Sequence, residues 1–290
     1  MYKFLLSTLL LISCLVGCSG ESKMVEKTSA PSAENINLIA RAKAIHAIAL
    51  TLDAHADIEI PGKPSSYVGR DGLSKVAPSK MHAGGLDAVV MAVAVGPMPR
   101  NTAGYAAAAK LAQIKLEAVK MLATDKTNNS VIVLSTDDLI TAHKEGKSAL
   151  LLGFQNALIL GTEIDGINDL YSSGVRVFAL THMGHNDFAD SSRTLFNGDN
   201  GRREPDAEHG GLSTLGKAAV KKINLLGGIM DISQLSSQAA LQAIELSVTP
   251  VIASHSNVRT LTDVSRNLSD EEIDRIGETG GVINIAPFRG

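Results

Sequence analysis

The sequence predicts an α/β fold, a (β/α)8 TIM-type barrel in which seven strands are evident. Apolar strand-like runs alternate with helical segments, and this alternation is typical of parallel strands joined by right-handed crossovers. Polar residues follow several strands at their carboxyl ends, where such a barrel forms its active site: His55, Asp57, Gln155, His182, Gln234 and His255. A doubly wound open sheet is the alternative. It would gather the polar residues at one switch point, and no glycine-rich nucleotide loop follows any strand.

The composition supports a single large domain. Hydrophobic residues make up 44% of the 290 residues and aromatic residues only 3%, so the core must consist mainly of Ala, Val, Leu and Ile. The formal net charge is −3 and no basic run stands out. Nucleic acid is therefore excluded as a partner.

The expected elements follow from apolar periodicity and from turn and capping signals. The strands are predicted at residues 51–57, 88–95, 149–155, 175–180, 229–234, 250–255 and 281–286. The helices are predicted at residues 36–50, 103–123, 136–147, 167–172, 213–226, 236–246 and 269–278. Residues 61–78 form a long connection after the first strand, and residues 197–211 a polar loop. Long loops after strands often carry function.

Residues 1–18 are predicted to be a lipoprotein signal peptide. An apolar stretch at 4–16, too short to span a bilayer, leads into Leu15-Val16-Gly17-Cys18, which resembles a bacterial lipobox with Cys18 as the lipidated residue. An ordinary secretory peptide is the alternative. Residues 19–35 read as a flexible tether and 36–290 as the barrel domain. The only other cysteine, Cys14, lies in the removed segment, so no disulfide is expected. The predicted location is the bacterial cell envelope, facing the periplasm or the exterior.

The stretch Asp53-Ala54-His55-Ala56-Asp57 closes the first predicted strand. Side chains alternate along a strand, so His55 and Asp57 are expected on one face. An imidazole and a carboxylate together can supply two ligands to a divalent cation. A hydrogen-bonded pair without metal is the simpler alternative.

In combination, the motifs resemble the membrane (renal) dipeptidase family of zinc metallopeptidases, which are amidohydrolase-type enzymes. The similarity runs from about Ala47 onward, and each motif lies at a predicted strand end or in the loop after it. The motifs are Asp53–Asp57, Leu180-Thr181-His182 with Asn186 and Ala189–Ser192, Gly211-Leu212-Ser213, Asp231-Ile232-Ser233, Ser254-His255-Ser256 and Arg266-Asn267.

This resemblance implies a barrel with two zinc ions bridged by a glutamate and a water. His55 and Asp57 match the ligands of the first ion, and His255 matches a ligand of the second. His182 matches the catalytic histidine that contacts the substrate near the scissile carbonyl, and Arg266 the arginine that binds the substrate carboxylate. A metal ion activates water and polarises a carbonyl, and a guanidinium suits a carboxylate, so the residue types fit these roles.

Three departures from the family pattern bear on activity. Gln155 stands at the position of the bridging glutamate, and Gln234 at that of a zinc histidine. An amide has no charge and is a poor zinc ligand. One or two zinc ions are therefore expected, and a binuclear site is doubtful. The family's catalytic aspartate belongs to an eighth strand, and no substitute for it is found here.

Further polar residues have structural readings beside functional ones. His185 and Asp187 are expected to cap a turn and Asp190 to hold a loop. Asp231 is expected to orient a ligand from behind. His46, His82, His143 and His209 show no partner pattern and are expected at the surface.

The sequence therefore predicts metal-dependent hydrolysis of dipeptides or similar small amides, impaired in this chain to an unknown degree. One alternative is a non-catalytic barrel that binds a small peptide through Arg266 and His182. Another is an incomplete product whose missing strand leaves an open sheet edge. The expected partners are a small peptide, the membrane through the lipid anchor, and a second copy in a homodimer.

Overall fold

A computed structural model describes residues 33–197 and 201–287. The signal peptide and most of the predicted tether lie outside these residues. The chain divides into two units, Met1–Ala44 and Ile45–Gly290. Helix α1 covers Ala33–His46, somewhat earlier than the predicted 36–50. Within the described part of the chain, no helix combines the length and apolar character that crossing a bilayer requires.

The second unit is built on a mostly parallel sheet that is nearly closed into a barrel. Its strands run in the order β1-β2-β4-β5-β8-β9-β10, and β3 pairs with the first half of β4. Each pairing along this path is parallel. The strands are β1 Leu52–Asp57, β2 Ala88–Ala94, β3 Ser130–Ile132, β4 Ser148–Gln155, β5 Val175–Ala179, β8 Ile229–Asp231, β9 Ile252–Ser256 and β10 Val282–Ile285. The α/β barrel with seven strands predicted from the sequence is confirmed.

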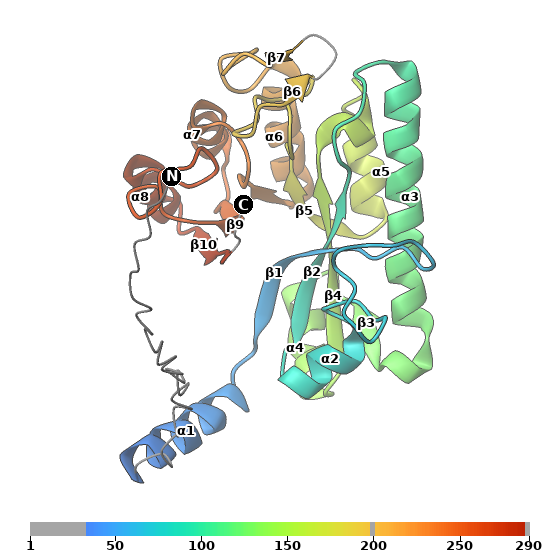
Figure 1. The fold of residues 1–290 in the computed structure, drawn as a ribbon, viewed down its shortest axis with the longest axis vertical. Coiled ribbons are helices and arrows are strands. Elements are labelled where there is room, and N and C mark those ends of the chain that lie inside the picture. Colours follow the sequence, from blue (N-terminus) through green and yellow to red (C-terminus); the bar gives the residue numbers. More distant parts are fainter. Residues whose placement is uncertain (1–32, 198–200, 288–290) are drawn as a thin grey trace, which may run out of the picture. The chain divides into compact units, whose positions relative to one another are not determined.

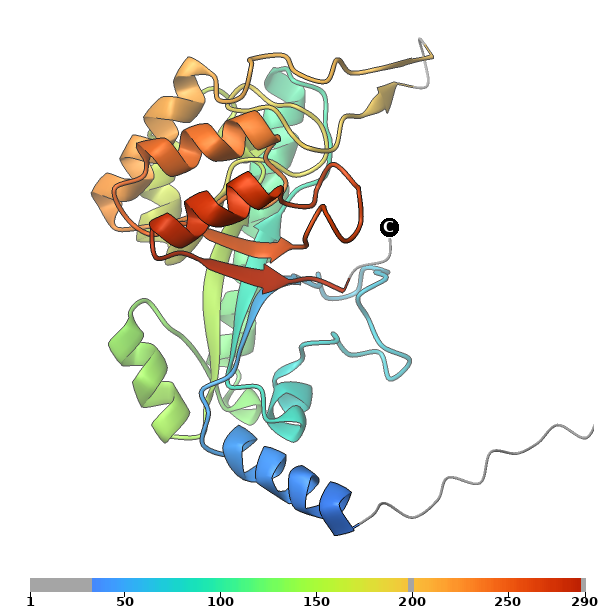
Figure 2. The same ribbon diagram turned by 90° about the vertical axis from the view of Figure 1, so that its left-hand side faces the viewer.

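Helices cover the outside of this sheet. They are α2 Pro78–Gly84, α3 Thr102–Thr124, α4 Thr136–Lys144, α5 Gly166–Ser172, α6 Thr214–Leu226, α7 Ser237–Leu246 and α8 Asp270–Glu278, with short 3-10 turns at Lys126–Asn128 and Ala157–Leu160. Figure 1 shows α3 and α5 along the outer side of β2, β4 and β5. Figure 2 shows α6, α7 and α8 side by side over β9 and β10.

Local chemistry accounts for these boundaries. All seven residues of β2 are buried, as expected for a strand covered on both faces. Ser213 caps α6 by accepting the Gly216 N–H, and Gly227 ends that helix in the left-handed region at φ 78°. Helix α8 begins with the capping box that the sequence predicted, in which Ser269 and Glu272 bond reciprocally.

Besides the 3-10 turns, four elements were not predicted. Helix α2 follows the long connection, strand β3 pairs with β4, and a short antiparallel pair, β6 Phe196–Asn197 and β7 Arg202–Arg203, lies in the polar loop. Each is too short for apolar periodicity to be distinguished from a turn. The long connections after β1 and β5 both contribute residues to the site described next.

Candidate metal and substrate site

A cavity of about 310 Å³ lies at the carboxyl ends of the strands. It is lined by six of the residues singled out in the sequence, which come from four separate parts of the chain: His55, Asp57, His182, Gln234, His255 and Arg266. The seventh, Gln155, is buried beside His255, with its Nε2 3.5 Å from the imidazole Nε2. The structure therefore brings all the predicted site residues together.

The two strand-end histidines each lie where the strand pairing is irregular. Between Asp53 and Ala56, β1 advances three residues while β2 advances two, and β9 gains one residue on β10 between Ala253 and Ser256. Such bulges are frequent beside active sites because they redirect a side chain. They place the rings of His55 and His255 in a stack, with centroids 3.8 Å apart.

A chain of hydrogen bonds orients His255 from behind. The Ser254 hydroxyl donates to Asp231 Oδ2 at 2.5 Å, and its oxygen lies 2.7 Å from His255 Nδ1. A hydroxyl has one proton, so Nδ1 must donate and His255 carries its proton there. The other ring nitrogen, Nε2, then presents a lone pair toward the cavity. Asp231 thus orients His255, as the sequence suggested.

Two glutamine amides face that lone pair. Gln234 donates to His255 Nε2 at 2.9 Å, and the Gln155 amide lies slightly farther away. Gln234 has φ 64°, an uncommon conformation for a side-chain-bearing residue, and it turns the amide toward β9. The carbonyl oxygens of both glutamines are buried without a hydrogen-bond partner among the described residues. A buried orphan oxygen calls for an explanation such as a bound ion.

His182 lies on the loop after β5 and faces the same cavity. Burial lowers the pKa of His182 to about 4, against a smaller opposing effect of Asp57. Its Nδ1 is buried and has no hydrogen-bond partner in the described part of the chain. At neutral pH this side chain is therefore a neutral imidazole with one N–H to offer.

Arg266 and Asp57 occupy different parts of the wall. Arg266 Nη2 donates to the backbone carbonyl of His255 at 2.7 Å, which fixes the guanidinium beside the histidine stack. Asp57 is hydrogen-bonded to Tyr67, on the long connection after β1, and contributes to raising the pKa of that phenol after burial. This hydrogen bond holds the segment 61–78 against the cavity.

The donor set fits one divalent cation and does not fit two. Ligand atoms of His55, Asp231 and His255 all lie within 4.8 Å of one another. Two neutral imidazoles and a carboxylate are ordinary zinc ligands. Asp231 rather than Asp57 completes this group. At the two positions where the family pattern has a glutamate and a histidine, Gln155 and Gln234 offer only amides, which bring no negative charge.

Comparison with known proteins agrees with this geometry. Residues 39–289 match the family described as Membrane dipeptidase (Peptidase family M19). The chain belongs to the membrane dipeptidase family. This confirms the family that the motifs predicted.

Individual relatives show how far the similarity extends. An uncharacterized dipeptidase, C965.12, of Schizosaccharomyces pombe (strain 972 / ATCC 24843) is 31% identical over 172 residues, which are 59% of this chain and 39% of that protein. The crystal structure of the probable dipeptidase PvdM from Pseudomonas aeruginosa matches with a TM-score of 0.78 and 32% identity, over 88% of this chain and 66% of that one. An amidohydrolase structure from Pseudomonas aeruginosa matches with a TM-score of 0.65 and 25% identity, over 84% and 64%. The chain thus spans less than two thirds of the length of these relatives.

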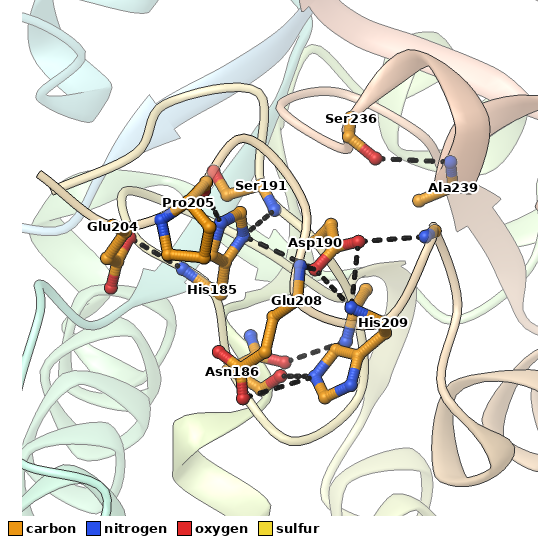
Figure 3. A network of polar contacts seen from close by, with 12 residues as sticks. His185, Asn186, Asp190, Ser191, Glu204, Pro205, Glu208, His209, Ser236 and Ala239 are labelled. Atoms are coloured by element: carbon orange, nitrogen blue, oxygen red, sulfur yellow. Dashed lines mark hydrogen bonds and ion pairs between the residues drawn. The ribbon is translucent and has the colours of Figure 1, made fainter.

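In this member of the membrane dipeptidase family, a buried network holds the loop that carries His182. The Asp190 carboxylate accepts backbone N–H bonds from Glu208, His209 and Gly211 (Figure 3). His185 accepts the Ser191 N–H and contacts the Pro205 carbonyl at 2.7 Å. Neither side chain lines the cavity, so both hold loops.

Asp187 and two of the remaining histidines also have partners. Asp187 binds Arg100 and the Tyr105 hydroxyl, which ties the loop to the start of α3. His143 Nδ1 lies 2.8 Å from Asp87, and His209 Nε2 lies 2.8 Å from the Asn186 carbonyl. The prediction that His143 and His209 are unpartnered surface residues was wrong, since their partners are far away in the sequence. His46 and His82 are exposed, as predicted.

Three cavity residues with ionisable side chains were not singled out from the sequence: Tyr67, Lys75 and Arg193. Tyr67 and Lys75 lie in the connection 61–78, whose length was the available signal. Arg193 directly follows the motif Ala189–Ser192. Its closeness to that motif was a signal, but its side-chain direction was not predictable.

Proposed function

We propose that this chain is a metal-dependent hydrolase of dipeptides or similar small amides. The single observation that carries the proposal is that His55 and His255 meet His182 and Arg266 in one cavity, with the buried Asp231 carboxylate close to both imidazoles. Family membership supports the same reaction class. Because the chain spans only part of its relatives, the activity is an inference for this chain and requires its own test.

A metal, with zinc implied by the family, would be held by His55 and His255, with the carboxylate of Asp231 within the same group of donor atoms. When bound, such an ion supplies Lewis-acid chemistry to water and to the peptide carbonyl. The Nδ1 tautomer of His255, set by Ser254, leaves Nε2 available as a ligand once the Gln234 amide moves aside. The residues favour one ion per chain.

The remaining side chains would bind and orient the peptide. His182, neutral at physiological pH, can donate a hydrogen bond to the carbonyl oxygen as negative charge develops there. Arg266 offers a guanidinium to the terminal carboxylate of the substrate. The cavity of about 310 Å³ suits a small peptide.

A second candidate function is peptide binding without metal. It is favoured by the Gln234 amide, which already satisfies the His255 lone pair at 2.9 Å, and by the absence of charge at Gln155. In this case His182 and Arg266 would bind the peptide and no bond would be cleaved.

Zinc uptake and turnover separate the two candidates. The full chain would be supplied with zinc, assayed for bound metal, and tested on a dipeptide panel. We expect about one zinc per chain and measurable hydrolysis, and both should be lost in His55→Ala. His82→Ala, which alters an exposed histidine of α2, is the matched control and should behave like wild type. No zinc uptake and no turnover would overturn the hydrolase proposal, and calorimetry with chelator present would then test peptide binding.

We also propose that the protein is a lipid-anchored component of the bacterial cell envelope. The lipobox-like Leu15–Cys18 supports this location. Fractionation of cells that express wild type or Cys18→Ser tests it, since only the wild type should stay with the membrane. The homodimer remains a prediction that light scattering of the purified protein can test.

A further inference from the structure

We propose that the cavity is built for a peptide with two anionic groups, a dipeptide with an acidic C-terminal residue, and that Arg193 binds the second carboxylate. This inference rests on the proposed function and deepens it by naming a substrate class. Arg193 would thereby be a specificity-determining residue. The argument depends on where two guanidinium groups lie relative to the metal ligands.

The backbone of Arg193 is fixed to the loop that carries His182. Its carbonyl accepts the Gly184 N–H at 2.8 Å, and its N–H donates to Ser191 Oγ at 3.1 Å. The same Ser191 hydroxyl donates to the His182 carbonyl at 2.6 Å. Arg193 and His182 are therefore presented to the cavity by one cross-linked loop.

The Arg193 side chain is half-buried in the cavity wall. Within residues 33–197 and 201–287, no hydrogen bond or ion pair of its guanidinium is found. This contrasts with Arg100, Arg176, Arg203, Arg259 and Arg275, whose side chains all bond to carboxylates or carbonyls. A half-buried guanidinium that has no anionic partner is favourable only when a ligand supplies the anion, so Arg193 is a candidate ligand-binding group.

A second guanidinium faces the same space. Arg266 is anchored to the His255 carbonyl, and burial lowers the pKa of Arg266, with the positive charge of Arg193 as a further cause. The two cations are therefore close enough to repel each other. One carboxylate suffices for one guanidinium, so two guanidiniums on one wall favour a dianionic ligand.

The two acidic residues that line the cavity make hydrogen bonds to groups other than Arg193. Asp57 is engaged with Tyr67, and Asp53 accepts the His55 backbone N–H at 3.0 Å. Lys75, which is exposed at the rim, adds positive charge on the side of the long connection. The part of the cavity that carries Arg193 and Arg266 is therefore rich in positive charge, and it suits the C-terminal residue of a peptide whose carbonyl lies beside His182.

Matched substrates and variants test the inference. Ala-Glu would be compared with Ala-Gln, and Ala-Asp with Ala-Asn, since each pair differs only by a charge. In wild type, kcat/KM should be about tenfold or more higher for the acidic member, mainly through a lower KM. Arg193→Gln should reduce this ratio to near one, because the loss should be much larger for Ala-Glu than for Ala-Gln. Arg193→Lys should keep part of the preference.

Arg70→Gln serves as the control. It removes an exposed arginine that lies in the connection 61–78 and does not line the cavity. It should retain the wild-type ratio. Calorimetry with Ala-Glu and Ala-Gln in the presence of chelator gives a second readout that needs no turnover. If no peptide is cleaved, the proposed function fails, and the ratio of dissociation constants still decides the inference. Equal affinity for both peptides, a preference that survives in Arg193→Gln, or an equal loss for both peptides would overturn it.

Discussion

The imidazole rings of His55 and His255 stack across the cavity, with centroids 3.8 Å apart and planes inclined by 24°. Two protonated rings at this separation would repel each other strongly. Burial lowers the pKa of His55, and it lowers the pKa of His255 to about 2. Both rings are therefore neutral at physiological pH. The stack presents two nitrogen ligands from β1 and β9, and the neighbouring amides determine what they can bind.

The first prediction concerns those amides. Replacing Gln234 by His and Gln155 by Glu should add an imidazole and a charged carboxylate beside His255. We expect zinc stoichiometry to rise from about one to two per chain, and affinity to increase by about tenfold or more. Histidine tolerates the left-handed backbone at position 234 better than most residues. Metal analysis after dialysis against graded zinc buffers provides the measurement.

Gln113→His is the control for this experiment, because Gln113 lies on the exposed side of α3 and bonds only to Glu117. It adds a histidine without adding a ligand to the cavity. An unchanged stoichiometry in the double variant would show that the two glutamines are not what limits the site to one ion.

The second prediction concerns Asp231. This buried carboxylate accepts the Ser233 N–H, the Ser254 N–H and the Ser254 hydroxyl. In Asp231→Asn an amide group would face donors, so a hydrogen bond is lost and a donor is left unsatisfied. The free energy of unfolding in urea should fall by about 2–3 kcal/mol. Asp274→Asn, on the exposed side of α8, should change it by less than about 0.5 kcal/mol. Equal effects of both changes would contradict the role given to Asp231.

The barrel could be predicted because its signals are local and repeated. Apolar runs such as 88–95 and caps such as Ser269 with Glu272 indicate elements independently of the rest of the chain. The cavity residues could be predicted because parallel strands present their carboxyl ends together. The detailed geometry could not. The bulges at His55 and His255 arise from pairing with neighbouring strands, and Asp231, not Asp57, is the carboxylate grouped with the two histidines.

The third prediction is a pH dependence centred on Asp190. Burial raises the pKa of Asp190, but the backbone N–H bonds from Gly211, Glu208 and His209 and the nearby His185 outweigh it, so the net pKa is lowered. The unfolded chain then binds the proton more readily than the folded one, and stability is lost as pH falls below about 5 toward the lowered pKa.

Asp190→Asn should therefore be less stable than wild type at pH 7, with a shallower decline between pH 5 and 3. Urea unfolding at intervals across this range measures both slopes. Asp206→Asn changes an exposed residue of the same loop and should keep the wild-type slope. A parallel decline in wild type and Asp190→Asn would exclude Asp190 as a cause of acid sensitivity.

The last prediction concerns two helical glycines with opposite surroundings. A Cβ on Gly216, in the first turn of α6, would fall on the carbonyl oxygen of Phe188, whereas a Cβ on Gly277 in α8 would meet nothing within 4 Å. Alanine is favoured over glycine in a helix by about 0.5–1 kcal/mol, so Gly277→Ala should stabilise the protein by up to that amount. Gly216→Ala should destabilise it by about 1–3 kcal/mol, because backbone must move. Phe188 belongs to the segment between His182 and Asp190, so Gly216→Ala should also lower kcat/KM, while Gly277→Ala should not. Thermal melts and peptide kinetics on both variants measure these effects, and a Gly216→Ala protein as stable and active as Gly277→Ala would show that the close approach of α6 to this loop does not position His182.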